Sequence, residues 1–201
     1  MIISTMMLYK RKMNEDGNVA KHKRRLVAHG NRQIKNLHYR EASSPAPAAA
    51  TTQMVLSATT VKDWELRHAD FERAYIQAPI YQEILIEIPE EYWEFPGAVG
   101  RLDKAIYGLV LAGRCWHMKI TYDLKARRFE QSHADPCLFS KIMDGEAVAV
   151  IVVYMDDLLI STKGSVKMDE LLVDLTEDNK LKGVGEAKYH LGCHITRDRQ
   201  R

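Results

Sequence analysis

The sequence AVAVIVVYMDDLLI, residues 147–160, decides the fold of this protein. Residues 147–154 form a continuous apolar run, and residues 158–160 form a second one. Continuous apolar runs of this length are typical of strands that are covered on both faces of a sheet. Asp156 and Asp157 lie between the two runs, so the pattern predicts two buried strands joined by a tight turn that carries two adjacent acids.

Two ionised carboxylates side by side are costly between buried strands, because both lose water and they repel each other. The turn can lift them from the sheet, or a divalent cation can compensate their charge. A plain solvated turn is the alternative, since Asp is a common turn residue. A third acid, Asp70, ends another predicted strand at residues 64–71. Carboxylates that converge from adjacent strands form the hard-oxygen site that suits magnesium.

Strands and helices interleave along the rest of the chain. Residues 8–13 and 19–30 flank Asp16-Gly17 and predict a β-hairpin. After a proline- and alanine-rich loop at 41–50, helices are expected over 51–62, 111–129 and 165–179, a strand over 84–88, and short strands within 181–195. This order of elements favours a sheet backed by helices.

The composition of the 201 residues, 46% hydrophobic and 28% charged, is ordinary for a soluble protein of one domain or two packed subdomains. The net charge is only +2, but residues 10–35 hold nine Lys or Arg and two acids. This local excess can bind phosphates, and a solvated hairpin face is the alternative. Three widely spaced cysteines and the lack of a membrane-length apolar segment predict a reduced, intracellular protein without membrane contact.

Eight segments resemble, in order and over nearly the whole chain, the reverse transcriptase of copia-type long-terminal-repeat retrotransposons. They are KHKRRLVAHG (21–30), WELRHADFERAY (64–75), EILIEIPEEY (83–92), RLDKAIYGL (101–109), AGRCW (112–116), ADPCLF (134–139), VVYMDDLLIS (152–161) and GEAKYHLGCHI (185–195). One Tyr-x-Asp-Asp motif is weak evidence, whereas eight collinear segments are strong evidence. The resemblance implies an α+β fold: a polymerase palm, with an antiparallel sheet backed by helices, and a fingers β-hairpin.

The resemblance also implies a domain organisation. The reverse transcriptase domain is expected over residues 1–201, with fingers at roughly 8–62 and the palm at roughly 63–201. Thumb and RNase H regions are expected to be absent, which predicts a fragment of a longer product or the decayed reading frame of an old insertion. In an intact element, integrase and RNase H regions of the Pol polyprotein are the expected partners.

The acids that match the family's metal ligands are Asp70, Asp156 and Asp157. They are expected to hold two magnesium ions, with manganese as a substitute. One ion would activate the primer 3′-hydroxyl and the other would stabilise the leaving pyrophosphate. Tyr154 and Met155 flank the acid pair and are expected beside the nucleotide.

Further residues of the resemblance are expected around the nucleotide and the primer. Tyr75 matches the aromatic gate that excludes a ribose 2′-hydroxyl, and a core tyrosine is the alternative. The cluster Lys23, Arg24 and Arg25 is expected to contact nucleotide phosphates, as are the backbone amides of residues 71–74, which include Phe71, Arg73 and Ala74, with Arg73 offsetting Glu72. Leu191 and Gly192 match the primer-supporting hairpin, and a plain turn is the alternative. Leu111 stands where the family keeps a glutamine that seats the nucleotide, and Val110 where it keeps a lysine.

These matches predict an RNA-directed DNA polymerase that takes a primed RNA or DNA template and deoxynucleoside triphosphates. The first alternative is a degenerate, non-catalytic remnant that at most binds nucleic acid, which Leu111 and the short chain favour. A metal-dependent nuclease or cyclase on a similar sheet explains the acids but not the basic hairpin. The expected location is intracellular, in cytoplasmic virus-like particles or the nucleus.

Overall fold

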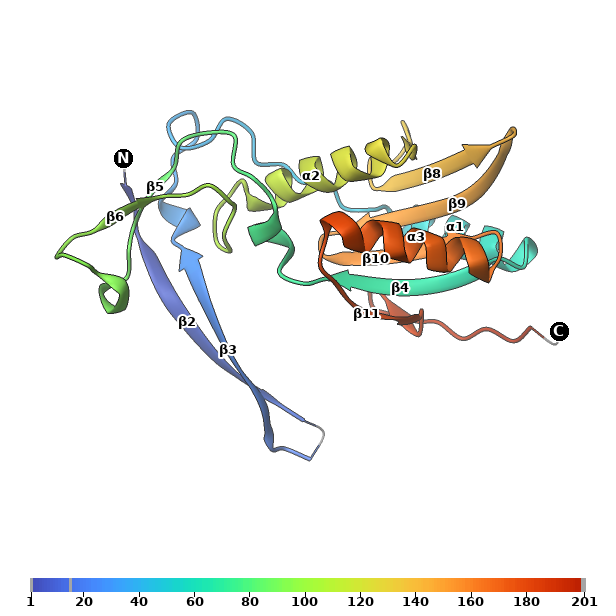
Figure 1. Ribbon diagram of the computed structural model, residues 1–201, viewed down its shortest axis with the longest axis horizontal. Helices are drawn as coiled ribbons and strands as arrows, with labels where there is room; N and C mark the ends of the chain where they lie inside the picture. Colours follow the sequence, from blue (N-terminus) through green and yellow to red (C-terminus); the bar gives the residue numbers. More distant parts are fainter. Residues whose placement is uncertain (1, 15, 200–201) are drawn as a thin grey trace. The chain divides into compact units, whose positions relative to one another are not determined.

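The computed structural model describes residues 2–14 and 16–199, apart from the side chain of Asp178. The described residues form a mixed α/β protein with three α-helices and several sheets (Figure 1). The chain divides into two compact units, Met1–Ser44 with Tyr75–Trp116, and Pro45–Ala74 with His117–Arg201. Both units are discontinuous in sequence, so they differ from a division at residue 62. The assignment of fingers to 8–62 and palm to 63–201 stays a prediction.

The second unit is built on a six-stranded antiparallel sheet in the order β11-β4-β10-β9-β8-β7. Its strands are β4 (Glu65–Phe71), β7 (Glu130–Gln131), β8 (Leu138–Met143), β9 (Glu146–Tyr154), β10 (Asp157–Thr162) and β11 (Leu181–Glu186). Strands β9 and β10 are the two apolar runs of the sequence, and they lie at the centre of the sheet. Ile151, Val152, Leu158 and Leu159 are fully buried, which confirms the prediction that both faces of these strands are covered.

Helices cover the two faces of the sheet (Figure 1). Helix α1 (Ala49–Val61) packs against one face, where Val55 meets Val152 and Leu159. Helix α3 (Ser165–Asp178) lies in front of the other face in Figure 1 and buries Met168. Helix α2 (Ala112–Ala126) belongs to the first unit through Trp116 and continues into the second. All three helices overlap the ranges that the apolar spacing predicts, although α1 begins two residues earlier than expected.

Asp135 fixes the start of α1. Its buried carboxylate accepts hydrogen bonds from the Ala48 amide at 3.0 Å, the Thr51 hydroxyl at 2.5 Å and the Cys137 amide at 2.9 Å. Ala48 is the N-cap residue, and its own side chain cannot satisfy the exposed amides of the first turn. The helix therefore begins at Ala49, inside the loop expected at 41–50, because an acid from a distant segment supplies the cap.

Replacing Asp135 by Asn should reduce the free energy of unfolding by about 2 kcal/mol at pH 7, because a buried network loses an ionised acceptor. Burial raises the pKa of Asp135, but the hydrogen bonds from Thr51, Cys137 and Ala48 outweigh it, so the net direction is down. A lowered folded-state pKa gives stability that is present above the unfolded pKa of about 3.9 and is lost as the pH falls through the folded value. The difference between parent and variant should therefore shrink in denaturant titrations at decreasing pH. A constant difference down to the acid limit would contradict this assignment.

The first unit contains two small sheets. Its strands are β1 (Ile2–Ile3), β2 (Thr5–Met13), β3 (Val19–Ala28), β5 (Leu85–Glu87) and β6 (Val99–Arg101). Short 3₁₀ turns lie at Gly30–Arg32, Ala74–Gln77 and Glu90–Tyr92, and the Ala74–Gln77 turn begins one residue before the unit boundary. β1, β5 and β6 form one sheet, and β2 and β3 form the predicted hairpin, drawn as a long two-stranded arm in Figure 1. Gly17 at its tip has a φ of 76°, the positive value that an Asp-Gly turn needs.

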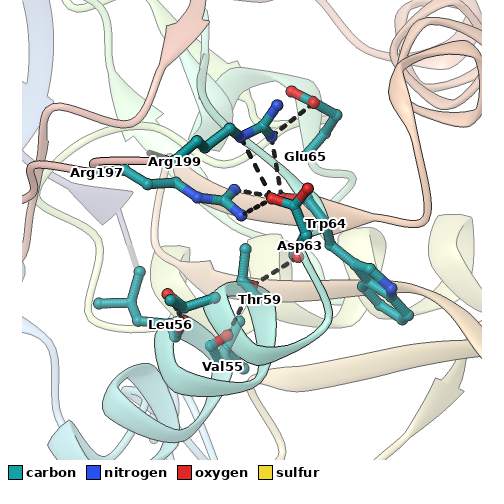
Figure 2. Close-up of polar contacts among 10 residues, drawn as sticks. Val55, Leu56, Thr59, Asp63, Trp64, Glu65, Arg197 and Arg199 are labelled. Atoms are coloured by element: carbon teal, nitrogen blue, oxygen red, sulfur yellow. Dashed lines mark hydrogen bonds and ion pairs between the residues drawn. The ribbon is translucent and has the colours of Figure 1, made fainter. Parts of the chain in front are cut away.

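The last described residues lie against the beginning of β4 (Figure 2). Arg197 donates to the Trp64 carbonyl and pairs with Asp63 at 2.6 Å. Arg199 pairs with Glu65 at 2.7 Å and with Asp63 at 3.5 Å. The two arginines thus hold the chain at the end of β4 that is opposite to Asp70. The remaining strands, β12 (Tyr189–His190) and β13 (Cys193–His194), form a small hairpin in the same unit.

Candidate active site

The three acids lie on neighbouring elements at one end of the central strands. Asp70 near the end of β4 lies directly opposite Asp157, the first residue of β10. Residues directly opposite each other in an antiparallel pair project from the same face of the sheet. The structure therefore brings Asp70 and Asp157 to one face, although they are 87 positions apart in the sequence numbering.

Asp156 lies in the turn that joins β9 to β10. Tyr154 lies opposite Asp157, so Met155 and Asp156 form a two-residue turn. Met155 has a φ of 51° and is half exposed, and the Asp156 carbonyl accepts a hydrogen bond from the Phe71 amide at 2.7 Å. A non-glycine residue with positive φ carries backbone strain of about 1 kcal/mol or more, which such sites often store. The strained turn and the bond to Phe71 together fix Asp156 beside the end of β4.

Two basic side chains contact the acids. The Lys182 ammonium on β11 lies 3.2 Å from Oδ2 of Asp70, and Nε2 of His68 lies 3.4 Å from Oδ1 of Asp157. Burial, together with the charges of Asp156 and Asp70, raises the pKa of Asp157, and His68 only partly offsets this. Burial first, and the neighbouring acids second, thus disfavour ionisation of Asp157, as expected of a carboxylate in a site that attracts a cation.

The three acids meet the chemical requirement of a magnesium site but not its close spacing. Among the described residues, no three His, Cys, Asp or Glu side chains are gathered tightly enough to hold a metal ion. The chemistry of the donors nevertheless fits, since hard carboxylate oxygens are the ligands that magnesium prefers. Oδ1 of Asp70 is also buried, with no hydrogen-bond partner among the described residues, and an acceptor in that state favours a cation.

In the first unit, the structure gathers Arg25, Tyr75 and Tyr107. The Arg25 guanidinium lies 4.6 Å from the centre of the Tyr107 ring, and the Tyr75 and Tyr107 rings are 4.9 Å apart. The first contact is a cation–π interaction, which holds the arginine in place while its N–H groups stay free to bind an anion. The sequence pattern does not identify Tyr107, because its contacts with Arg25 and Tyr75 depend on the close approach of residues 107–108 to the end of β3.

The other members of the basic cluster have different surroundings. Arg24 lies on the opposite face of the hairpin from Arg25, 5.6 Å from the centre of the Tyr92 ring, and Lys23 is half-buried. Lys10, Lys12 and Lys21 are exposed, and none has an ion pair with a described residue. Lys10 and Lys12 belong to the basic excess predicted over residues 10–35, but the pattern of β2 alone does not show which residues of β3 they face.

The structure does not leave all of the expected backbone amides of residues 71–74 available to a nucleotide. The amides of Phe71 and Glu72 donate to the carbonyls of Asp156 and Lys180, both at 2.7 Å, so they are not available to a triphosphate. These two amides bond to neighbouring segments because the end of β4 is hydrogen-bonded on both of its edges. Arg73 has a φ of 56° and pairs with Glu72 at 3.6 Å, which fits the expectation that it offsets that acid.

Leu111 is only 5% exposed and lies in the core at the start of α2. The expected site position is therefore filled by an apolar side chain that offers no hydrogen bond to a ligand. The Val110 amide, just before it, donates to the Gln33 side chain at 2.7 Å. Nε2 of Gln33 is buried and has no hydrogen-bond partner among the described residues.

Leu191 and Gly192 form the two-residue turn between β12 and β13, with φ values of 48° and 84°. Two successive positive φ values are typical of a tight hairpin turn. Both residues line a cavity of about 520 Å³ that also contains His68, Tyr154 and Asp157. The predicted hairpin is therefore present and adjoins the acids, whereas its role as a primer support stays a prediction.

The mixed α/β fold and the acid-bearing hairpin are compatible with a polymerase domain, and comparison with known proteins identifies the family. Residues 1–200 match the family model described as reverse transcriptase (RNA-dependent DNA polymerase). The chain belongs to this family. The resemblance found in the eight sequence segments is thereby confirmed.

The similar curated proteins are plant retrotransposon polyproteins. The chain is 30% identical over 195 residues to the retrovirus-related Pol polyprotein from transposon TNT 1-94 of Nicotiana tabacum, covering 96% of this chain and 15% of the relative. It is 30% identical over 198 residues to that from transposon RE2 of Arabidopsis thaliana, covering 98% of this chain and 14% of the relative. A third, from transposon RE1 of the same plant, is 29% identical over 198 residues, covering 98% of this chain and 13% of the relative. The chain thus spans about one seventh of the length of these relatives.

Proposed function

We propose that this chain is the RNA-directed DNA polymerase domain of a retrotransposon Pol polyprotein and adds deoxynucleotides to a primer 3′-hydroxyl. The observation that carries the proposal is the pairing of Asp70 with Asp157 beside the Asp156 turn. We assign the second unit to the palm and the β2–β3 hairpin to the fingers. No described helix has the length and apolar character needed to cross a membrane.

In this proposal Asp70, Asp156 and Asp157 would hold two magnesium ions, or manganese in their place. The ions would lower the pKa of the primer 3′-hydroxyl and neutralise the leaving pyrophosphate. The protein itself contributes positioning, since phosphoryl transfer needs little covalent chemistry from side chains. Arg25, held by Tyr107, would bind triphosphate oxygens. Tyr75, packed on the same ring, would limit the space beside the sugar and so select deoxynucleotides.

The exposed hairpin supports binding of a nucleic-acid strand. Lys10 lies directly opposite Lys23, and Lys12 lies directly opposite Lys21. All four project from one face, since the pairs are two residues apart along each strand. Like charges that face each other destabilise a hairpin, so an anion beside this face would be stabilising. A phosphate backbone supplies a row of negative charges of suitable extent.

Replacing Lys10 and Lys12 by Gln should weaken binding of single-stranded RNA and reduce the slope of log affinity against log salt by about 1.4, at about 0.7 for each lost phosphate contact. Fluorescence anisotropy with a labelled oligonucleotide, without nucleotide, measures the affinity and its salt slope. The salt is varied over roughly 50–200 mM, the range in which phosphate contacts dominate the affinity. The matched control replaces Arg11 and Lys35 by Gln. Arg11 projects from the other face of the same hairpin, and the change in net charge is equal. Equal slopes for the two variants would contradict binding by the lysine-bearing face.

Incorporation of labelled deoxynucleotide on a primed poly(rA) template, with magnesium or with EDTA, tests the proposed polymerase. Magnesium-dependent extension supports it. A second candidate is a folded, non-catalytic remnant, which the buried Leu111 favours because it removes a polar group from the expected nucleotide site. Folded protein that binds RNA but gives no extension with magnesium would support the remnant.

A further inference from the structure

Lys182 occupies a special position beside the acids. Strand β4 lies between β10 and β11, and Asp70 is directly opposite Asp157 on one side and Lys182 on the other. The three side chains therefore share one face of the sheet in the order Lys182, Asp70, Asp157. The sequence alone does not connect Lys182 with Asp70 or Asp157, because Lys182 lies outside the segments that carry the three acids.

The contact of Lys182 with Asp70 is direct. Its Nζ lies 3.2 Å from Oδ2 of Asp70, whose other oxygen is buried and has no hydrogen-bond partner in the part of the chain that the structure describes. The Asp70 side chain is 27% exposed and that of Lys182 is 49% exposed. The ammonium thus contacts a partly exposed carboxylate through Oδ2 and leaves the buried Oδ1 without its charge.

The strand that carries Lys182 is irregular next to it. The pairing of β11 with β4 shifts between Lys182 and Gly185, and Gly183 has a φ of 59°. A Cβ atom at Gly183 would meet nothing within 4 Å. β11 is also an edge strand of the sheet. An edge strand with an irregularity and two nearby glycines can let a lysine side chain leave its partner without disturbing the core.

We propose that Lys182 is a resident counter-cation of the acid cluster, which a divalent metal ion must displace from Asp70 before it binds. The lysine would neutralise Asp70 in the metal-free protein and lower the affinity of the site for metal. It is a positioning residue and not a catalytic one. This inference rests on the proposed function, because it takes Asp70 as a metal ligand.

Direct measurement of Mn²⁺ binding to the purified chain tests the competition without any need for turnover. The paramagnetic resonance signal of free Mn²⁺ reports the bound fraction. Lys182→Met keeps the length of the side chain and removes its charge. We expect it to bind Mn²⁺ about five- to tenfold more tightly, because a unit charge a few ångströms away in a partly solvated site has an effect of this order. Lys182→Arg should restore the affinity of the parent.

The matched control is Lys125→Met, which removes an exposed lysine at the end of α2 in the same unit and should change the affinity by less than about twofold. Unchanged or weaker Mn²⁺ binding by Lys182→Met would overturn the competition. If neither parent nor variant binds Mn²⁺, both the competition and the metal site fail. If all of them bind Mn²⁺ equally, the metal site stands and only the role of Lys182 fails.

A stability measurement in the absence of metal gives a second test. Lys182→Met should lower the melting temperature when Asp70 is present and have less effect in the Asp70→Asn background, because the lost partner is then already neutral. Purely additive effects of the two changes would overturn the role of Lys182 as a counter-cation.

Discussion

Replacement of Asp156 by Asn is expected to abolish magnesium-dependent incorporation, with a loss of at least about a hundredfold. The change removes one charge from the site that would hold the metal ions, and such ions contribute several kcal/mol of transition-state stabilisation, at about 1.4 kcal/mol for each factor of ten. The backbone role of Asp156 is kept, because its carbonyl, and not its side chain, accepts the Phe71 amide.

The loss should not come from unfolding. The charge of Asp156 is one of the causes that raise the pKa of Asp157, so its removal relieves repulsion in the metal-free protein. A carboxyl whose folded-state pKa is raised is destabilising when ionised, above the folded pKa, and this effect disappears below the unfolded value. At neutral pH, Asp156→Asn should therefore melt no lower than the parent.

The matched control is Asp144→Asn, an exposed residue with a φ of 52° in the turn between β8 and β9 of the same sheet. It makes the same chemical change in a turn that contains none of the three candidate-site acids, and incorporation should stay near that of the parent. Full activity of the Asp156 variant would refute the assignment of the metal site. Equal losses in both variants would point to a general effect on the sheet.

Replacement of Gly108 by Ala is expected to destabilise the first unit by roughly 3–5 kcal/mol, the sum of a left-handed backbone and a severe overlap. Gly108 has a φ of 87°, and a Cβ atom there would lie 2.1 Å from the Ala28 carbonyl oxygen and 2.7 Å from a Val27 methyl group. The first of these atoms belongs to the backbone and cannot rotate away. The neighbouring Tyr107 carbonyl accepts the Ala28 amide at 2.8 Å, so the overlap would break this hydrogen bond too.

Hydrogen exchange of the Ala28 amide measures the effect inside the first unit, where a global melting curve could mix the two units. Exchange should become much faster in Gly108→Ala. Gly17→Ala is the matched control, since Gly17 has a similar φ of 76° but open space around it, and it should cost only about 1 kcal/mol. The same acceleration in both variants would show that backbone strain, and not the close approach to β3, determines the effect.

Local patterns predicted much of the fold. The apolar run before Tyr154 and the helical spacing in α2 and α3 act over a few neighbouring residues, so periodicity reveals them. The start of α1 was misplaced by two residues, because Asp135 caps it from 87 positions away. The division of the chain into two discontinuous units also depends on tertiary contacts that no local pattern records.

The site shows the same limit. Asp70 and the Asp156–Asp157 pair were found because each follows a predicted strand, and the structure places Asp70 opposite Asp157. Lys182 and Tyr107 were missed, because their roles depend on which strand or loop lies next to them. The expected amide contacts of Phe71 and Glu72 differ because those donors complete the hydrogen bonding of β4.

The arginine contacts at the start of β4 have a consequence for the alignment of the strands. Successive residues of a strand point to opposite faces, so a slip of β4 by one residue would turn Asp70 away from Asp157. Arg197 and Arg199 grip Asp63, the Trp64 carbonyl and Glu65, and thereby fix where β4 begins (Figure 2). Asp70 lies at the far end of the same strand, about 17 Å away at 3.4 Å per residue. The two arginines therefore help to set the register of β4, and this register keeps the Asp70 carboxylate on the same face of the sheet as Asp157.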